Sequence, residues 1–372
     1  MNVKERLAEK LLSGLKEVPA LIGLDGFLDE IVCVVDKRTD ADHYTRIRTM
    51  DEYGKRISGG SGLSCNIEII PLQQKLGGNG PIFANALKSN NMKITYIGSV
   101  GENGIHPIFD ELSGSARMIG IAQPGQTSAY EFNDGKIIVS KIEHFKNITW
   151  EKILRTVGLE EFIRIFDASA LIGFENWTMV PRMSDIWSNV MVHVLPSLTR
   201  PTREKTIFFD LADPEKRDGA DIRTAIDLIG QFTEFGFQTV LGLNKKEACE
   251  IFELYDGKIG DYHALPLERL NCRLAERINV TCLVIHPVDR ASCVLNGKFT
   301  CVDGPYCTDP VLTTGAGDNF NAGFITGWMN DFEPEECLLC GAATSGYYVR
   351  KGRSPSTGEL AQFLLDWEKE RI

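Results

Sequence analysis

TTGAGDNFNAGFITGWM, residues 313–329, joins a turn of small residues directly to a segment with helical spacing. Such a turn leaves the first amides of the helix without partners, and the positive end of the helix dipole lies behind them. Gly315 and Gly317 allow a phosphate to approach the backbone, and Asp318 stands beside it on the first helical turn. Taken alone, the residues leave two interpretations open: an anion site with a carboxylate base, or a turn in which Asp318 only caps the helix.

Around this stretch, short apolar runs alternate with segments of helical spacing along most of the chain. We expect buried strands at residues 20–23, 94–100, 170–174, 206–211, 239–243 and 282–286. Helical patterns lie between them, at residues 80–90, 159–166, 183–198, 222–236 and 245–254. The alternation predicts an α/β fold with a doubly wound, mostly parallel sheet, helices on both faces, and ligands at the carboxyl ends of the strands.

Two regions interrupt this alternation, residues 31–58 and 117–142. In the second, Asn133, Asp134 and Gly135 separate two strand-like runs, and such residues supply the positive φ angles that a tight hairpin turn requires. We therefore expect a small β lid inserted at about these two regions. No linker divides the chain, so we expect one domain over residues 1–372.

The composition excludes several classes of protein. The 372 residues include 40 Lys and Arg against 51 Asp and Glu, a formal charge of −11, which disfavours a nucleic-acid or anionic-membrane partner. No run approaches the ~20 apolar residues of a membrane span, and the ten cysteines are scattered as expected for reduced thiols. Leucines separate Cys337 from Cys340, which favours a helix interior over a zinc site. We expect a cytoplasmic protein.

The residues that flank the glycine-rich turn extend its pattern. Thr313 and Thr314 precede it, and Asn319-Phe320-Asn321-Ala322-Gly323 follows it. The whole string resembles the C-terminal signature of the ribokinase-like (PfkB) carbohydrate kinases, D-T-x-G-A-G-D-x-F-x-x-G, and the resemblance covers about residues 20–355. It implies a ribokinase-like fold and an ATP-dependent sugar kinase, a phosphotransferase with an alcohol group as acceptor.

The resemblance also implies roles for the residues of the turn. Asp318 would be the general base that takes the proton of a sugar hydroxyl. The backbone amides of Gly315, Ala316 and Gly317 would stabilise the charge that develops on the transferred group, while Mg²⁺ bridges the phosphates of ATP.

A second stretch is similar to the family's N-terminal signature and implies where the sugar acceptor binds. It consists of LGGNGPIFANAL, residues 76–87, followed by IGSVG, residues 97–101. In the family the paired glycines lie against the sugar hydroxyls, so Gly77, Gly78 and Asn79 are expected to bind the acceptor. A plain strand-to-helix turn is the alternative.

Two acids near the N-terminus compete for the role of the family's sugar-binding aspartate. Asp25 lies closer to the end of the first strand, whereas Asp29 aligns better with the family's pattern. A carboxylate accepts hydrogen bonds from two vicinal hydroxyls, so both remain candidates for substrate binding.

Asn244 and Glu247 resemble the family's N-x-x-E motif, which helps to place the magnesium ion and phosphate through water. The alternative is a capping box in which Asn244 caps a helix and Glu247 reaches back to it, and both interpretations can hold together. The residues expected to bind the nucleotide are Asn244, Thr313, Thr314 and Gly352.

Departures from the family pattern leave alternatives open. Leu312 stands where an aspartate is common, Ile82 stands where an asparagine commonly contacts sugar, and His286 lies in a segment that normally borders the nucleotide. A nucleoside kinase, an ADP-dependent sugar kinase and a non-catalytic sugar- or nucleotide-binding protein are therefore the alternatives. An acceptor that already carries phosphate would need a cation, which Lys37, Arg38, Arg46 and Arg48 could offer. A homodimer through the lid is possible, because an unpaired sheet edge favours pairing.

Overall fold

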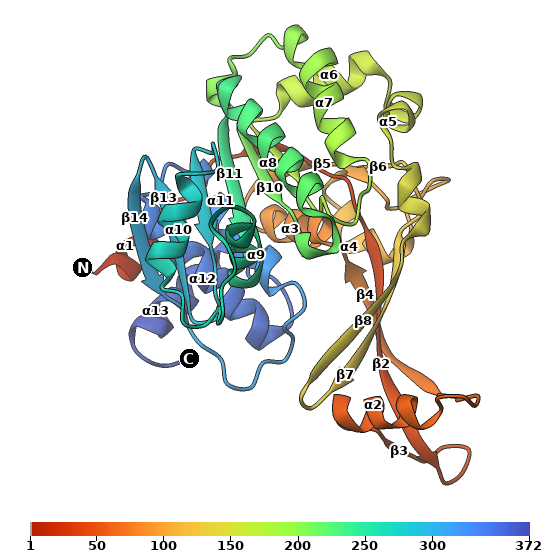
Figure 1. Cartoon of the computed structure of the whole chain (residues 1–372). Coiled ribbons are helices and arrows are strands. Elements are labelled where there is room, and N and C mark those ends of the chain that lie inside the picture. The colour runs from red at the N-terminus through yellow and green to blue at the C-terminus, as the bar shows by residue number, and fades with distance from the viewer. Residues whose placement is uncertain (1) are drawn as a thin grey trace.

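The computed structural model describes residues 2–372, and it has two parts (Figure 1). The body, residues 2–26, 78–124 and 142–372, is built around a nine-stranded sheet. The lid, residues 27–77 and 125–141, holds a second sheet that projects from one side of the body. Both chain termini lie on the body, on the side away from the lid (Figure 1).

The body sheet contains all six strands expected from the sequence. Its spatial order is β14 (Lys298–Asp303), β13 (Arg290–Leu295), β12 (Cys282–Ile285), β11 (Gln238–Leu243), β10 (Thr206–Asp210), β9 (Leu171–Phe174), β1 (Val18–Gly23), β5 (Met92–Gly98) and β6 (Arg117–Gly120). The strands from β12 to β6 are parallel, and β13 and β14 are antiparallel. The hairpin of β13 and β14 was not predicted, although Asn296 and Gly297 form its turn at positive φ.

Helices cover both faces of this sheet, as predicted. One face carries α5 (Trp150–Val157), α6 (Leu159–Ala168), α7 (Met183–His193), α8 (Gly219–Glu234), α9 (Lys245–Asp256) and α10 (Leu267–Ala275). The other carries α1 (Val3–Leu12), α3 (Asn79–Lys88), α4 (Asp110–Ser113), α11 (Ala316–Met329), α12 (Pro334–Lys351) and α13 (Thr357–Glu368). The short 3₁₀ turns are η1 (Pro107–Phe109), η2 (Glu143–Asn147), η3 (Leu195–Ser197), η4 (Thr202–Glu204) and η5 (Pro214–Lys216).

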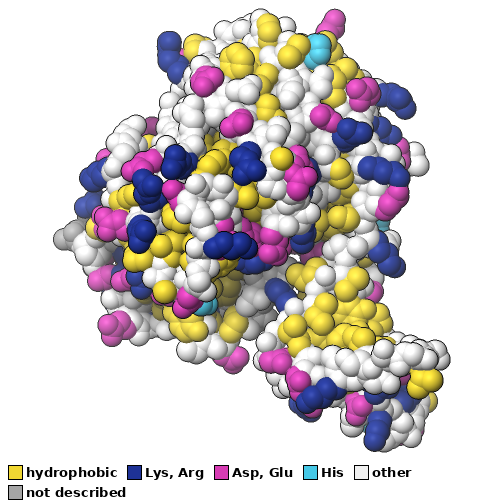
Figure 2. Space-filling model, viewed as in Figure 1, with side chains coloured by type: hydrophobic (Ala, Val, Ile, Leu, Met, Phe, Trp, Pro, Cys, Tyr) yellow, Lys and Arg dark blue, Asp and Glu magenta, His cyan; other side chains and the backbone are white. Residues whose placement is uncertain are grey.

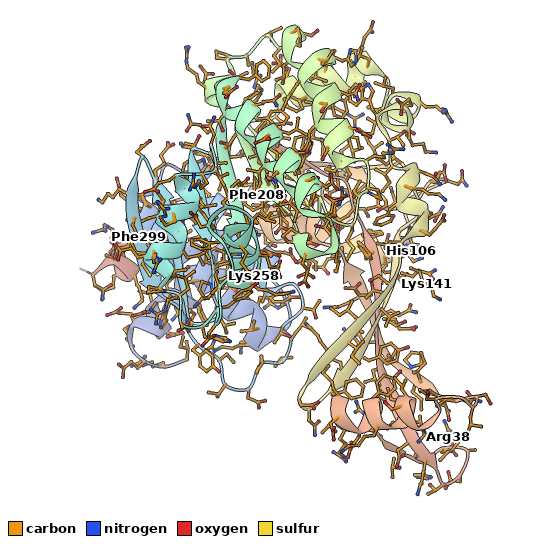
Figure 3. The ribbon with its side chains drawn as sticks, viewed as in Figure 1. Arg38, His106, Lys141, Phe208, Lys258 and Phe299 are labelled. Carbon is orange, nitrogen blue, oxygen red and sulfur yellow. The ribbon has the colours of Figure 1, made fainter. Side chains whose placement is uncertain are left out.

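The two cores meet at strands that are buried on both sides. In β10, Ile207 and Phe209 belong to the first core, and Phe208, labelled in Figure 3, belongs to the second. Phe208 stacks on Phe83 of α3 with ring centroids 5.0 Å apart. Continuous apolar strands of this kind are typical of parallel sheets covered on both faces.

The lid sheet centres on β2 (Phe27–Arg38), which pairs with β3 (Tyr44–Arg46), β4 (Ile69–Gly77) and β7 (Gly125–Phe132), while β8 (Gly135–Lys141) pairs with β7. Helix α2 (Met50–Gly59) packs on its outer face, where Tyr53 stacks on Tyr130 and Phe132. The predicted hairpin at Asn133-Asp134-Gly135 joins β7 to β8.

The lid boundaries differ from the expected 31–58 and 117–142. The first segment is longer because β4 pairs with β2 along most of its length, so the lid runs to residue 77. Residues 117–120 belong to the body, because β6 extends the body sheet by pairing in parallel with β5.

Strand connectivity places a crevice above the centre of the body sheet. From β1 the chain moves to β5 and β6 on one side, and then returns to β9 on the other side. Loops after strands on either side of such a reversal diverge and leave room for ligands at the carboxyl ends. Within residues 2–372, no helix is long and apolar enough to cross a membrane.

Candidate active site

A cavity of about 440 Å³ lies between the carboxyl ends of the body strands and the lid. The loops after β9, β10, β11 and β12 bring in Asn176, Asp213, Asn244 and His286 respectively. The lid contributes Phe27, Asp29, Thr127, Ala129, Lys136, Ile138 and Ser140. Figure 2 shows the notch between body and lid on the molecular surface.

The glycine-rich turn forms the floor of this cavity at the start of α11. Gly315 is the N-cap at φ 92°, and a Cβ there would lie 2.9 Å from the Tyr348 hydroxyl. That hydroxyl donates to the Thr314 carbonyl at 2.8 Å, and Asn319 Nδ2 donates to the Gly315 carbonyl at 2.9 Å. The turn is thus held from two sides.

The backbone N–H groups of Gly315, Gly317 and Asp318 have no acceptor within residues 2–372. The N–H of Ala316, by contrast, donates to the Thr313 carbonyl at 3.1 Å. Three free amides at a helix N-terminus form an anion site. The tight turn already uses the Ala316 amide, so its expected contribution to the anion site stays a prediction without a free N–H group behind it.

Asp318 is buried at the junction of this turn and the cavity. It is 7% exposed, and Asn79 Nδ2 donates to its Oδ1 at 2.9 Å. Burial raises the pKa of Asp318 to about 8, and the nearby Asp25, Glu247 and Asp29 add to the rise. A carboxyl with a raised pKa in a cleft is a typical proton acceptor.

The two candidate acids for sugar binding have different surroundings. Asp25 is fully buried, does not line the cavity, and accepts hydrogen bonds from the backbone N–H groups of Asn79 and Gly80 at 3.0 Å and from Asn176 Nδ2 at 2.8 Å. Burial raises the pKa of Asp25 to about 6, against the opposing effect of these donors. Asp25 therefore caps α3 from the body side.

Asp29 comes from lid strand β2 and lines the cavity. Its carboxyl lies against Gly77, where a Cβ would be only 2.2 Å from the carboxyl carbon. Burial raises the pKa of Asp29, while Lys75 and Thr127 oppose the rise. Gly77 does not line the cavity, and the lack of a side chain at this position makes room for the Asp29 carboxyl. Gly78 and Asn79 do line the cavity.

Asn244 and Glu247 form a capping box, which was one of the two interpretations that the sequence allowed. Glu247 N donates to Asn244 Oδ1 at 3.0 Å, and Asn244 N donates to Glu247 Oε2 at 2.9 Å. The other oxygen, Oε1, accepts from Asp213 N at 3.0 Å. Both side chains line the cavity, so the metal role stays a prediction that the capping role does not exclude.

Asp210, at the end of β10, is a cavity residue that was not among the predicted site residues. Its Oδ2 accepts from Asn321 Nδ2 at 3.0 Å, while its buried Oδ1 has no partner within the described residues. Burial raises its pKa, and the charges of Glu247 and Asp318 add to the rise. The sequence feature that could have identified Asp210 as a site residue is its position at the carboxyl end of a buried strand.

A second cavity, of about 350 Å³, adjoins the first and shares Asn244, His286, Thr313 and Gly317 with it. Its other lining residues are mainly apolar or small: Pro287, Val288, Arg290, Gly304, Pro305, Cys307, Pro310, Ala316, Phe320, Ala342, Ser345, Gly346 and Val349. His286 stacks on Phe320 with ring centroids 4.7 Å apart, and burial lowers the pKa of His286 to about 4, so its ring is neutral near pH 7.

Gly352 lines neither cavity. It ends α12 in the left-handed region at φ 70°, which explains the glycine as a helix C-cap. Its nucleotide contact stays a prediction without a structural contact behind it.

Basic residues of the lid separate into two groups. Lys37, Arg38, Arg46 and Arg48 do not line the cavity. Arg38 lies at the far end of the lid (Figure 3), whereas the Arg48 carbonyl accepts from Asn133 N of the turn between β7 and β8 at 2.8 Å. Lys136, which was not predicted, does line it. Two-residue alternation along β8 places Lys136, Ile138 and Ser140 on one face, and that pattern was available in the sequence.

Comparison with known proteins identifies the family of this chain. The model of the family described as prokaryotic ketohexokinase matches residues 2–367. A ketohexokinase from Haloferax volcanii is 26% identical over 364 residues, 97% of this chain and 94% of that protein. Ribokinase from Arabidopsis thaliana, complexed with ribose and ATP, has a TM-score of 0.62 at 14% identity and covers 94% of this chain and 99% of its own.

A putative ribokinase II from E. coli, in complex with ATP and Mg²⁺, has a TM-score of 0.62 at 15% identity, covering 95% of this chain and 100% of its own. The chain therefore belongs to the prokaryotic ketohexokinase family and is an ATP-dependent sugar kinase with a ribokinase-like fold, which confirms the fold and reaction class predicted from the sequence.

Proposed function

We propose that this kinase phosphorylates a ketohexose and that Asp318 is its general base. The observation that carries the proposal is the position of Asp318 between the three free amides of the α11 turn and the cavity that holds Asp29. A hydroxyl in the cavity would reach the carboxylate, and a phosphoryl group on the amides would lie beside it. The ketohexose acceptor follows from the family and from the relative in Haloferax volcanii.

The two adjoining cavities divide the substrates between them. The second cavity has the apolar walls that suit a nucleotide base, and the first has carboxylate, amide and hydroxyl groups that suit a sugar. Thr313 and Gly317 lie where the cavities meet, so the phosphates of ATP would cross from one to the other over the start of α11.

In the transfer step, the sugar hydroxyl oxygen forms a bond to the γ-phosphorus as the bond to the bridging oxygen of ADP breaks. The hydroxyl proton passes to Asp318, which must be ionised to accept it. Asn79 orients the carboxylate through its bond to Oδ1 and leaves Oδ2 for the hydroxyl. Asp29 would hold neighbouring sugar hydroxyls as an acceptor of their hydrogen bonds.

The residues below the cavity fit a hydrated Mg²⁺ ion. Asp210 has a buried oxygen without a partner, and Glu247 and Asn244 lie on the same side of the cavity. Oxygen donors of this kind suit magnesium, which keeps several of its waters. When bound, the ion neutralises phosphate charge; Asp210, Glu247 and Asn244 would hold it there.

The test is ADP release in a coupled assay with ATP and magnesium, across ketohexoses, aldohexoses, pentoses and nucleosides, with ADP as an alternative donor. We expect turnover on a ketohexose, lowered about 100- to 10,000-fold in Asp318→Asn. Asp331→Asn, an exposed acid just beyond the end of α11, is the matched control and should keep wild-type turnover. Preference for another acceptor class would reject the ketohexose, and a fully active Asp318→Asn would reject the base.

A further inference from the structure

The lid lysine Lys136 reaches the anion site of the body. Its Nζ donates to Thr313 Oγ1 at 3.2 Å and also contacts Thr314 Oγ1. These two threonines immediately precede the turn that presents the free amides of Gly315, Gly317 and Asp318. An ammonium group from the lid therefore lies next to a set of unpaired backbone donors from the body.

The charge of Lys136 is not neutralised by an ion pair. Two lysines line the cavity, Lys136 and Lys216, and Lys216 is paired with Asp213 at 3.2 Å. Within residues 2–372 no carboxylate lies in salt-bridge range of Lys136, whose contacts are the neutral threonine hydroxyls. Burial lowers its pKa, although Glu131 and Asp29 oppose this from a distance. A half-buried cation that has only neutral partners is suited to bind an incoming anion.

We propose that Lys136 is a catalytic residue that the lid supplies to the phosphoryl group in transfer. The proposal rests on the placement of that group at the α11 turn. As the sugar oxygen bonds to phosphorus, the bond to ADP breaks, its electron pair remains on the ADP oxygen, and the hydroxyl proton goes to Asp318. Lys136 transfers no proton: it donates hydrogen bonds to the phosphoryl oxygens, opposite the amides of Gly317 and Asp318.

The origin of Lys136 in the lid has a mechanistic consequence. It is the second residue of β8, directly after the turn that joins β7 to β8, and its strand belongs to the lid sheet alone. The cation reaches the phosphoryl site only while the lid lies against the body, which is also when the sugar is covered. The arrangement ties full stabilisation of the transferred group to the presence of the acceptor.

The test compares Lys136→Met and Lys136→Arg with Lys141→Met. Lys141 lies on the same strand, is exposed, and points away from the body (Figure 3), so it is a matched control. We expect Lys136→Met to lower kcat about 100-fold or more while the Kd for ATP changes less than about threefold. Lys136→Arg keeps the charge, so its kcat should be at least about tenfold higher than that of Lys136→Met. The kcat of Lys141→Met should match that of wild type.

A second measurement keeps the proposal testable if Lys136→Met folds poorly. Lys136→Gln preserves the length of much of the side chain, and the complex with ADP, aluminium fluoride and a ketohexose mimics the transferred group. We expect the affinity of Lys136→Gln for this complex to fall by about the same factor as its kcat. Unchanged kcat in both neutral variants, a loss confined to the sugar KM, or equal affinity for the fluoride complex would overturn the proposal. An active Asp318→Asn would instead contradict the placement of the reaction itself.

Discussion

The body and the lid are held together in different ways. Every residue of β9, β10 and β12 in the body is buried, whereas α2 in the lid buries none of its residues. On lid strand β8, Ile138 and Val139 are 51% and 50% exposed. Apolar burial is extensive in the body, whereas in the lid it is confined mainly to residues 32–35, Ile47 and Ala129. The body is therefore the rigid part, and the lid is expected to open at a lower free energy.

The charges at the site follow this division only in part, because the lid also contributes Asp29 and the body also contributes Lys216. Asp25, Asp210, Glu247 and Asp318 come from the body, and burial raises the pKa of all four. For Asp210 and Asp318, the charges of neighbouring acids add to the rise. The lid contributes the lysine that lines the cavity beside Asp318, Lys136. On the proposed mechanism, the body would therefore hold the base, Asp318, and the lid would supply the cation, Lys136.

The largest expected effect is on stability, from Asp25→Ala in the body. Removing this carboxylate leaves two backbone donors of α3 and Asn176 Nδ2 without an acceptor in a buried site. We expect the free energy of unfolding to fall by about 3–5 kcal/mol, measured by urea denaturation.

The matched change in the lid is Asp29→Ala. Asp29 faces the cavity, so we expect the KM for sugar to rise about 10- to 100-fold while the free energy of unfolding changes by less than about 1 kcal/mol. If Asp25→Ala folds normally and loses only sugar affinity, the assignment of the two acids is reversed.

Local signals in the sequence were enough to predict most of the body, although not β6 or the hairpin of β13 and β14. Six of the seven parallel strands, the helices between them and the turn at Gly315 to Asp318 each depend on neighbouring residues, so periodicity and turn chemistry identify them. The hairpin at Asn133-Asp134-Gly135 was predictable for the same reason.

What the sequence did not reveal depends on contacts between distant segments. Lys136 meets Thr313 across 177 positions, and no local pattern relates them. The choice between Asp25 and Asp29 required knowing that Asn176, far along the chain, donates to Asp25. The extent of the lid was underestimated because the pairing of β4 with β2 is itself a long-range contact.

The next expected effect, of intermediate size, is the pH dependence of stability without ligands. The pKa of Asp318 is about 8 in the folded chain against an ordinary value of 3.8, so folding takes up a proton between these pH values. Stability should therefore fall as pH rises from about 4 to about 8. Asp318→Asn has no such proton to lose.

In thermal or urea denaturation, the variant should match wild type near pH 3.5 and exceed it by on the order of 2 kcal/mol at pH 8. This is less than the full shift, because water reaches the cavity. A variant that is less stable than wild type at pH 8 would show that Asp318 also supports the fold.

The smallest effect compares two capping boxes of the same design. Thr49 and Glu52 cap α2 in the lid, and Ser356 and Glu359 cap α13 in the body. Loss of such a cap costs about 1 kcal/mol of helix stability. Because α13 packs into the body core, Ser356→Ala should lower the global free energy of unfolding by about that amount. Thr49→Ala should leave global unfolding unchanged and instead speed amide hydrogen exchange in residues 50–59. Equal losses of global stability in the two variants would mean that lid and body unfold as one cooperative unit, which would contradict a lid that opens independently.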